Sequence, residues 1–231
     1  MELVLVRHGE PEWVREGLNV DDPPLTDRGW RQARAVADAL RDEHFDEVWV
    51  SPLVRARQTV TPLASERGST VETIVQNWLE EIRNPVWHGT PREKADAAYA
   101  EERGRPSHER WRGLEGGEPT RDFVERIHLG ASLFLTERGI EERFVRRGID
   151  LPMWSIADDT RRILLVAHAG TNSVIISHLM GFVPTPWEWD RFSLGHASIS
   201  RVTSIGMGDG HTFCLTTLGD VEHLPRHERT R

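Results

Sequence analysis

Residues 161–170 read RRILLVAHAG, and this stretch has the clearest strand pattern in the chain. Ile163–Ala167 is a short, unbroken apolar run, which is typical of a strand buried on both faces of a parallel sheet. The next residues, Thr171–Met180, have the pattern of a helix that Gly181 would end. A buried strand followed directly by a helix predicts an α/β fold.

Other segments extend this pattern toward both ends of the chain. Strands are predicted at Glu2–Arg7, Glu47–Val50 and Thr70–Val75, with one helix from the N-cap Thr26 to Leu40 and another from Leu53 to Glu66, stopped by Gly68. Ser198–Ile205 and Thr212–Leu218 predict an antiparallel pair joined by the glycine-rich turn 206–210. The polar residues from Glu222 onward are expected to be frayed. We therefore predict a three-layer αβα sandwich with a mostly parallel central sheet.

The stretch from about residue 83 to residue 158 interrupts this regular order with prolines and a glycine-rich turn region. Helices are predicted in it around Arg92–Arg103 and Thr120–Arg138. We expect a single domain, 1–231, in which this segment is an insertion that forms a lid or side layer over the site. The alternative is a helical connection that only crosses one face of the sheet.

Composition excludes several classes of protein. The chain has 231 residues, with 29 basic and 37 acidic residues and a net charge of −8, which argues against a nucleic-acid binder with a basic surface. Its apolar runs are far shorter than a membrane-spanning helix needs, and the start MELVLVRHGE has no apolar signal core. Cys214 is the only cysteine, so no internal disulfide can form and a cytoplasmic location is expected. The oligomeric state stays open.

Three predicted strands end in residues that could hold a phosphate. The first ends in Arg7-His8-Gly9, the second reaches Arg55 within one helical turn, and the late strand ends in His168. Sites in such sheets form beyond the carboxyl ends of the strands. Arginine forks bind the oxygens of a tetrahedral anion, and a neutral imidazole can attack phosphorus. Because paired arginines repel cations, we expect no metal and no cofactor.

The chain resembles the histidine phosphatase superfamily, which is also called phosphoglycerate mutase-like. The resemblance is carried by four segments that occur in the family's order: VRHGE at Val6–Glu10, PLTDRGWRQA at Pro24–Ala33, VSPLVRARQT at Val50–Thr59 and LLVAHAGT at Leu164–Thr171. It implies that the protein acts on a small phosphorylated substrate. The substrate itself is not identified by these segments.

The resemblance also implies a role for each matching residue. His8 would be the nucleophile that becomes phosphorylated, while Arg7, Arg55 and His168 would hold the phosphoryl oxygens. Glu81 would be the proton donor of the reaction, with Glu80 as the alternative.

Two small residues complete this predicted site. Gly9 would let the backbone approach the anion closely beside the nucleophile, because it has no side chain. Ala169 would offer its backbone N–H to the anion.

Some positions depart from the family pattern. Many members have Gly-Gly after the second histidine, where this chain has Ala169-Gly170. Mutases show a Ser or Thr and then Trp-Asn after the first motif, where this chain has Pro11–Val14, and their basic segment before the second half is not evident here. These differences favour a phosphatase. A phosphoglycerate mutase and a catalytically inactive module that binds a phosphorylated ligand are the alternatives.

Three further signals are not assigned to the site. His178 lies on the helix after His168 and is expected at the surface. The run Pro186–Trp189 either borders the pocket or packs against the body of the domain. His196 and Ser198 stand at the start of a predicted strand, and we assign a role to neither.

Overall fold

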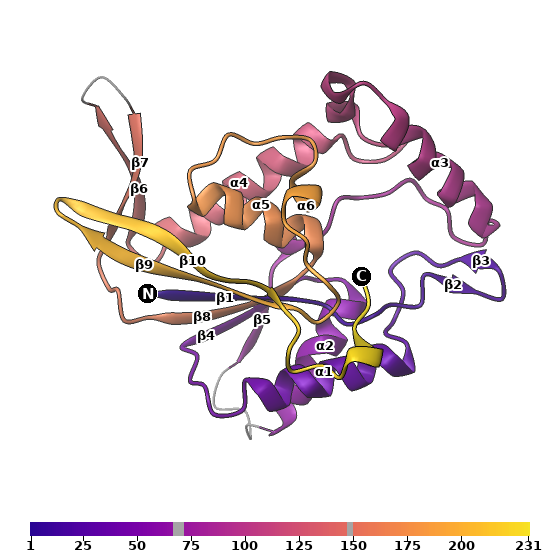
Figure 1. Ribbon diagram of the computed structural model, residues 1–231, viewed down its shortest axis with the longest axis horizontal. Helices are drawn as coiled ribbons and strands as arrows, with labels where there is room; N and C mark the ends of the chain where they lie inside the picture. Colours follow the sequence, from indigo (N-terminus) through magenta and orange to yellow (C-terminus); the bar gives the residue numbers. More distant parts are fainter. Residues whose placement is uncertain (67–71, 147–149) are drawn as a thin grey trace.

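The computed structural model describes residues 1–66, 72–146 and 150–231. Within these residues an eight-stranded sheet of order β5-β4-β8-β1-β9-β10-β7-β6 forms the middle layer (Figure 1). Its strands are β1 (Glu2–Arg7), β4 (Glu47–Val50), β5 (Thr73–Val75), β6 (Ile140–Arg146), β7 (Asp150–Ile156), β8 (Arg162–Ala167), β9 (Ile199–Met207) and β10 (Gly210–Asp220). A separate ribbon pairs β2 (Val14–Arg15) with β3 (Leu18–Asn19).

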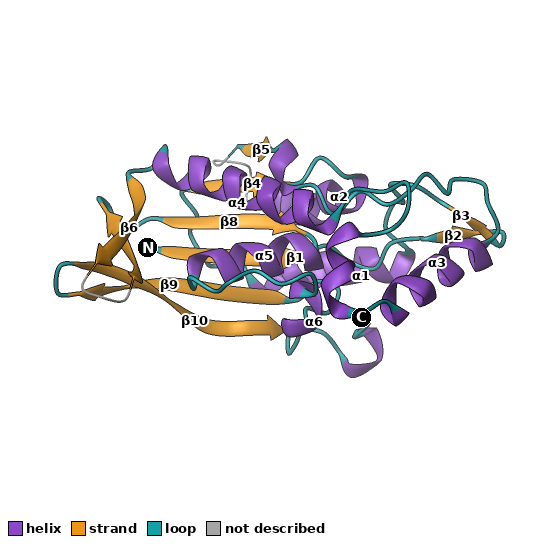
Figure 2. Cartoon of the chain, turned by 90° about the horizontal axis from the view of Figure 1, so that it is seen from above, coloured by secondary structure: helices purple, strands orange, loops and turns teal. Residues whose placement is uncertain are grey.

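Helices cover both faces of the sheet (Figure 1). One face carries α1 (Asp27–Ala39) and α2 (Val54–Glu66), and the other carries α4 (Thr120–Thr136), α5 (Ala169–Leu179) and α6 (Glu188–Arg191). Helix α3 (Arg92–Gly104) stands away from the sheet beside the β2–β3 ribbon, as Figure 2 also shows. Short 3-10 turns lie at η1 (Asn77–Leu79), η2 (Ser107–Arg112) and η3 (Arg226–Glu228). The predicted αβα sandwich is therefore confirmed.

The sheet has a parallel half and an antiparallel half. Strands β5, β4, β8 and β1 are parallel to one another, so their carboxyl ends lie at one edge. Strand β9 is antiparallel to β1, and its first residues therefore lie at that same edge. Strands β10, β7 and β6 continue the antiparallel half.

Alternation along β1 explains its unbroken apolar sequence. Leu3 and Leu5 pack into the core on the α4–α5 side, whereas Val4 and Val6 pack into the core on the α1–α2 side. Successive side chains of a strand point to opposite faces, so a strand covered on both sides needs an apolar residue at every position. Strand β8 follows the same rule, since Ile163 and Leu165 pack on the α4–α5 side and Leu164 and Val166 on the α1–α2 side.

The predicted element starts agree well with the structure. Thr26 caps α1, since its hydroxyl accepts a hydrogen bond of 3.0 Å from the Gly29 N–H. Helices also begin at Arg92 and Thr120, as predicted. The predicted stop at Gly68 and the first residues of the predicted strand Thr70–Val75 lie outside the described residues.

The segment from 83 to 158 is divided among three parts of the molecule. Helix α3 stands beside the β2–β3 ribbon, α4 buries Phe123 and Ile127 in the core, and β6–β7 extends the sheet next to β10 (Figure 1). The β6–β7 hairpin was not predicted. Its charged sequence EERFVR does not alternate cleanly between polar and apolar residues, which removes the usual signal of a strand.

Two expectations about exposure are wrong. The C-terminal residues are not frayed, because Leu224 is buried and the Gln32 side-chain amide donates to the Glu228 carbonyl at 2.7 Å. Their partners lie on α1, and a polar composition does not reveal such distant partners. His178 is buried too, with its ring 4.7 Å from that of His128 on α4, because α5 is covered nearly all round.

Two smaller observations complete the description. In the run Pro186–Trp189, the Glu188 side chain is fully buried and accepts a hydrogen bond from the Thr185 N–H at 2.7 Å, so this residue packs inside the domain. Among the described residues, none of the helices has the length and apolar character that crossing a lipid bilayer requires.

Candidate active site

The carboxyl edge of the parallel strands brings the predicted histidines together. His8 follows β1 and His168 follows the neighbouring strand β8, and their ring centroids are 5.0 Å apart. Arg55 reaches them from the first turn of α2, just after β4, and its Nε donates to His8 Nε2 at 3.3 Å. All three side chains are buried, with exposed fractions of 0–4%. Residues separated by as many as 160 positions thus lie side by side at this edge of the sheet.

The His8 ring is held in one tautomer. Its Nδ1 lies 2.7 Å from the Gly9 carbonyl oxygen, which can only accept, so Nδ1 carries the proton and donates. The Nε2 lone pair is then the acceptor of the hydrogen bond from Arg55 Nε. Burial, followed by the charges of Arg55, His168 and Arg7, holds the pKa of His8 well below its usual range. His8 is therefore a neutral base and potential nucleophile at neutral pH.

His168 offers a second imidazole to the same space. Its Nε2 lies 2.7 Å from the Ser51 hydroxyl, while its buried Nδ1 has no hydrogen-bond partner among the described residues. His168 is also the N-cap residue of α5, so the positive end of the helix dipole lies beside it. Burial and the charges of Arg55 and Arg7 keep the pKa of His168 well below its usual range, so the ring stays neutral unless an anion lies beside it.

The two arginines differ in how they are held. Arg7 donates from Nη1 to the Leu194 carbonyl at 2.5 Å and from Nη2 to His196 Nε2 at 2.9 Å. Burial lowers the pKa of Arg7 to about 10, which still leaves it charged at neutral pH. Arg55 stacks 4.8 Å from the centre of the Trp13 ring and lies 3.6 Å from the Asp22 carboxylate. Both guanidiniums lie close enough to His8 and His168 for their charges to lower the pKa of each ring.

Glu81 lies against the first turn of α5. Its Oε2 accepts a hydrogen bond of 2.8 Å from the Gly170 N–H, and its Oε1 accepts one of 2.9 Å from its neighbour Ile82. Burial raises the pKa of Glu81 above its usual value in spite of these two bonds. A Cβ at position 170 would overlap with the Glu81 carboxylate, which explains why glycine is needed there. Ala169, at the first position of α5, is adjacent to this contact.

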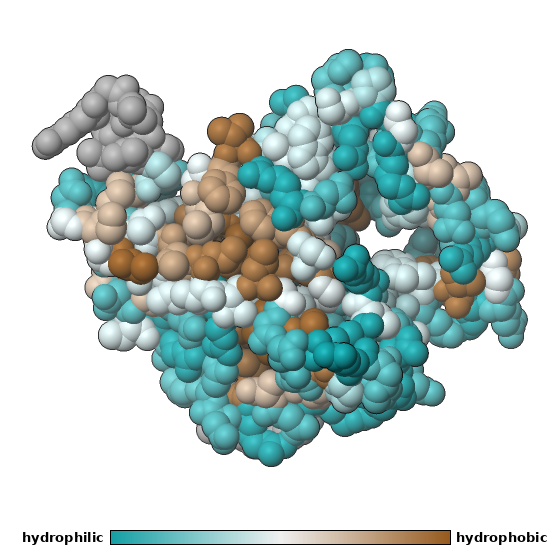
Figure 3. Space-filling model, viewed as in Figure 1, coloured by the Kyte–Doolittle hydropathy of each residue, from teal (hydrophilic) through white to brown (hydrophobic). Residues whose placement is uncertain are grey.

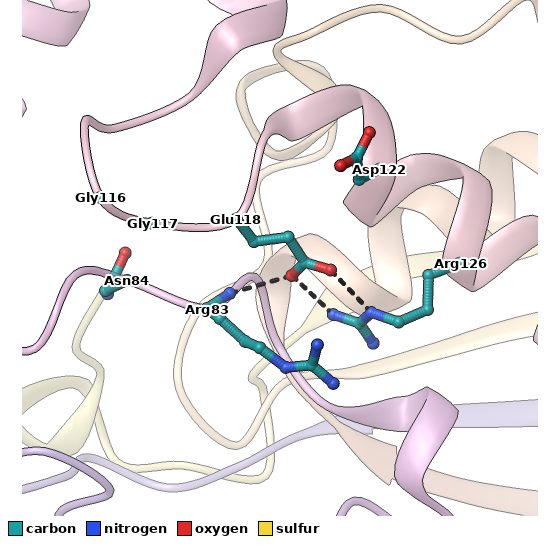
Figure 4. A pocket seen from close by; sticks show the side chains of 7 residues that line it. All are labelled: Arg83, Asn84, Gly116, Gly117, Glu118, Asp122 and Arg126. Carbon is teal, nitrogen blue, oxygen red and sulfur yellow. Dashed lines mark hydrogen bonds and ion pairs between the residues drawn. The ribbon is translucent and has the colours of Figure 1, made fainter.

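Ion pairs hold the loop that carries Glu81 (Figure 4). Arg126 on α4 donates to the Glu80 carbonyl at 3.0 Å and to the Glu81 carbonyl at 3.3 Å. The Arg126 guanidinium is itself fixed by Glu118, which accepts two hydrogen bonds of 2.9 Å from it and one of 3.1 Å from the Arg83 N–H. These residues line an open groove of about 510 Å³ next to the loop. Glu80, by contrast, forms an ion pair of 2.8 Å with Arg83 at the surface.

Gly9 has a clear packing reason for being glycine. A Cβ at position 9 would lie 2.6 Å from the Gly29 carbonyl oxygen at the start of α1. The Gly9 N–H donates to the Thr59 hydroxyl on α2 at 3.0 Å. The close approach of α1 therefore accounts for this glycine, and its expected contact with an anion stays a prediction.

Three residues near the site were missed or left unassigned. Ser51 bonds to His168, Asp22 pairs with Arg55, and His196 lies with its ring 5.7 Å from that of His8. Ser51 stands directly after a predicted buried strand, and that position was a usable signal. His196 precedes β9, and only knowledge that β9 runs antiparallel to β1 would have placed it here.

Comparison with known proteins adds an independent line of evidence. The family model of the histidine phosphatase superfamily (branch 1) matches residues 3–212. Phosphoserine phosphatase 1 of Hydrogenobacter thermophilus is 35% identical over 104 residues, which are 44% of this chain and 48% of that relative. The probable phosphoglycerate mutase GpmB of Photorhabdus laumondii is 31% identical over 235 residues, which are 97% of this chain and 95% of the relative.

Solved structures show the same fold at lower identity. The mycobacterial glucosyl-3-phosphoglycerate phosphatase has a TM-score of 0.64 at 24% identity, covering 94% of this chain and 98% of that one. The alpha-ribazole phosphatase from Shigella flexneri has a TM-score of 0.68 at 23% identity, covering 95% of this chain and 96% of that one. Because the family model matches most of the length of this chain, the chain belongs to the histidine phosphatase superfamily, branch 1.

Proposed function

We propose that the protein is a metal-independent phosphatase that hydrolyses a small phosphate monoester through a phosphohistidine intermediate. The observation that carries the proposal is the state of His8. This ring is neutral, its Nδ1 donates to the Gly9 carbonyl, and its Nε2 lies beside Arg55 and near the ring of His168. An unprotonated nucleophile beside two groups that bind oxyanions suits attack on phosphorus.

In the first step, His8 Nε2 attacks phosphorus in line with the ester oxygen. The new N–P bond forms as the P–O bond to the leaving alcohol breaks, and Glu81 gives its proton to the departing oxygen. Arg7, Arg55 and the Nδ1–H of His168 bind the phosphoryl oxygens, while Ser51 donates to His168 Nε2 and keeps that tautomer. The Ala169 N–H at the start of α5 adds a backbone donor.

In the second step, water cleaves the intermediate. Glu81, now ionised, takes a proton from the attacking water, whose oxygen forms a new bond to phosphorus as the N–P bond breaks. Inorganic phosphate leaves and His8 returns to its neutral form. The raised pKa of Glu81 suits a group that must donate in one step and accept in the next.

The second candidate is a phosphoglycerate mutase, in which the phosphoryl group returns to a hydroxyl of the sugar acid. Relatives named as probable phosphoglycerate mutases match nearly the whole chain, which favours this candidate. Pro11–Val14, which replaces the mutase-type segment after the first motif, favours the phosphatase. The two reactions share their first half and differ in the acceptor.

As part of the same proposal, the chain forms one domain, 1–231, that acts in the cytoplasm. The segment from 83 to 158 selects the leaving group, since it begins right after Glu81 and contains the Glu118–Arg126 pair that holds the donor loop. The arginines lining the groove beside this loop are themselves paired with glutamates, so they offer little net charge to a second anionic group.

A phosphate-release screen over a broad panel of phosphate monoesters, with chelator present, tests the proposal. We expect release of inorganic phosphate and none from the His8→Ala variant. With 3-phosphoglycerate as substrate, formation of 2-phosphoglycerate without release of phosphate would identify the mutase instead. The inactive binding module predicts neither product and no acid-labile, alkali-stable phosphoprotein after incubation with substrate.

A further inference from the structure

Arg7 is held entirely by uncharged acceptors. Its Nη1 donates to the Leu194 carbonyl at 2.5 Å and its Nη2 donates to His196 Nε2 at 2.9 Å. Its buried Nε has no hydrogen-bond partner among the described residues. Two of the three guanidinium nitrogens are thus fixed from the side of residues 194–196, and each of these two keeps a second N–H that these contacts do not use.

The tautomer of His196 follows from this contact. A guanidinium can only donate, so His196 Nε2 must accept, and the ring proton must lie on Nδ1. Nδ1 then donates to the Thr230 hydroxyl at 2.9 Å, and the His196 N–H donates to the Thr230 carbonyl at 3.0 Å. The ring is 5% exposed, so solvent does not compete for these bonds.

Thr230 is fixed in turn by α1. The Gln32 amide donates to the Thr230 hydroxyl at 3.0 Å, while its carbonyl oxygen accepts from the Glu10 N–H at 2.7 Å. A chain of hydrogen bonds therefore runs from α1 through the C-terminal residues to Arg7. This series of hydrogen bonds explains why the polar C-terminal segment packs against the domain.

The backbone next to His196 is also bonded to the end of β1. Ala197 has a φ of 56°, a left-handed conformation that a residue with a side chain rarely adopts. It is fully buried, and its N–H donates to the His8 carbonyl at 3.0 Å. Segment 195–198 is thereby locked to the end of β1, which carries Arg7 and His8.

We propose that His196, held by Thr230, is a positioning residue that orients Arg7 toward the phosphoryl group and adds no negative charge beside it. A carboxylate at this position would fix the guanidinium equally well, but it would cancel the charge that attracts the phosphate. A neutral imidazole acceptor gives orientation without neutralisation. The inference rests on the proposed function, in which Arg7 binds the phosphoryl oxygens.

The test compares three substitutions at position 196, using binding of inorganic phosphate by calorimetry together with kcat and KM for a substrate found in the screen. His196→Leu removes the acceptor, and we expect phosphate affinity and kcat/KM to fall about tenfold or more. His196→Gln keeps a neutral acceptor and should stay within about threefold of the original protein. His196→Glu keeps an acceptor but adds charge, so phosphate affinity should fall about tenfold while the fold persists.

The matched control is His178→Leu, which replaces an imidazole of similar burial far along α5 from its first turn. It should lower the melting temperature without changing phosphate affinity. Thr230→Val should act in the same direction as His196→Leu, and Thr230→Ser should restore the original behaviour because it keeps the hydroxyl.

Each outcome decides between the alternatives. Unchanged phosphate affinity and kcat/KM in His196→Leu would overturn the positioning role, as would a His196→Gln variant that is as impaired as His196→Leu. Equal affinities of the Gln and Glu variants would overturn the argument on charge, and this pair serves even if the Leu variant does not fold. An original protein that neither binds nor releases phosphate overturns the proposed function as well, whereas an active one with insensitive variants overturns only the inference.

Discussion

The two sides of the site are built in different ways. On the phosphate side, His8, His168 and Arg55 stand directly at strand ends or in the first helical turn after one, and they are almost completely buried. On the leaving-group side, Glu81 lies on a loop that is held by Arg126 and Glu118. In the proposed mechanism, the sheet thus fixes the chemistry common to all phosphate esters, while side-chain contacts from segment 83–158 fix the proton donor.

The same physical cause acts in opposite directions on the two sides. Burial disfavours charge, so it lowers the pKa of His8 and raises the pKa of Glu81. The site therefore contains a base that stays neutral and an acid that holds its proton more tightly than a free carboxyl group. Because the pKa of His8 is lowered from 6.5 and that of Glu81 is raised from 4.5, an unprotonated base and a protonated acid can be present together and divide the roles of nucleophile and general acid.

Breaking the phosphate side should have the largest effect. His8→Ala removes the attacking nitrogen, and we expect kcat to fall on the order of 10⁴-fold or more, as for other catalytic nucleophiles. Turnover of p-nitrophenyl phosphate measures this loss. His44→Ala, at an exposed histidine, is the control and should behave like the original protein. A kcat within tenfold of the original value would show that another group is the nucleophile.

Breaking the leaving-group side should have an effect that depends on the substrate. Glu81→Gln cannot donate a proton, and we expect a loss of about 10²–10⁴-fold for an alkyl phosphate. The loss should be much smaller for p-nitrophenyl phosphate, whose leaving group needs little protonation. Rates measured with both substrates in both proteins test this difference. Equal losses for the two substrates would argue that Glu81 is not the proton donor.

The pH dependence of kcat/KM, measured for the original protein and for Glu81→Gln, tests the same assignment. His8 must be unprotonated, so activity should fall as pH drops through its lowered pKa, well below 6.5. Glu81 must be protonated in the first step, so activity toward an alkyl phosphate should also fall as pH rises through its raised pKa, above 4.5. The profile of kcat/KM should be a bell limited by His8 at low pH and by Glu81 at high pH. Glu81→Gln should lose the high-pH limb attributed to this carboxyl group.

The phosphate side could be predicted from the sequence because its signals are local. Each buried strand ends in the residue that matters, and parallel neighbours bring such ends together without further information. The strand ends predict that His8, Arg55 and His168 lie together, and the structure brings the three side chains into contact. Ser51 follows the same logic, since it stands directly after β4.

The positions of His196, Thr230 and His178 could not be predicted, because the residues that they contact lie far away in the sequence. His196 and Thr230 reach Arg7 only through the antiparallel half of the sheet and the packing of the C-terminal residues on α1. His178 looked like a surface residue because the neighbours that bury it, His128 and Trp154, lie on other elements. Polar side chains with partners far away in sequence carry no periodic pattern from which their burial could be derived.

One residue joins the two sides, and changing it should have an intermediate effect. Gly170→Ala places a Cβ where the Glu81 carboxylate lies, so the carboxylate must move away from α5. We expect kcat for an alkyl phosphate to fall about tenfold, since a small misplacement of a catalytic group is costly, with little change for p-nitrophenyl phosphate. Gly104→Ala, where an added Cβ meets nothing within 4 Å, is the matched control. Equal losses for both substrates would point to damage on the phosphate side instead.

The smallest effect is expected from loosening the support of the donor loop. Arg126→Gln removes the charge that bonds Glu118 and the carbonyls of Glu80 and Glu81. We expect the free energy of unfolding to fall by about 2 kcal/mol, which is typical of hydrogen bonds to a charged group, and kcat for an alkyl phosphate to fall about threefold. Denaturant unfolding and the two-substrate assay measure both.

The matched control for this change is Arg92→Gln on α3. Arg92 pairs with Asp96 at 3.1 Å, but both side chains are at least 60% exposed, so its loss should cost less than about 0.5 kcal/mol and leave turnover unaltered. One outcome is that Arg126→Gln destabilises the protein and leaves unchanged the ratio of kcat for the alkyl phosphate to kcat for p-nitrophenyl phosphate. In that case the Arg126–Glu118 pair supports the fold only. A changed ratio means that the donor's position is set by α4, and that the inserted segment shapes the chemistry of the leaving group as well as its access.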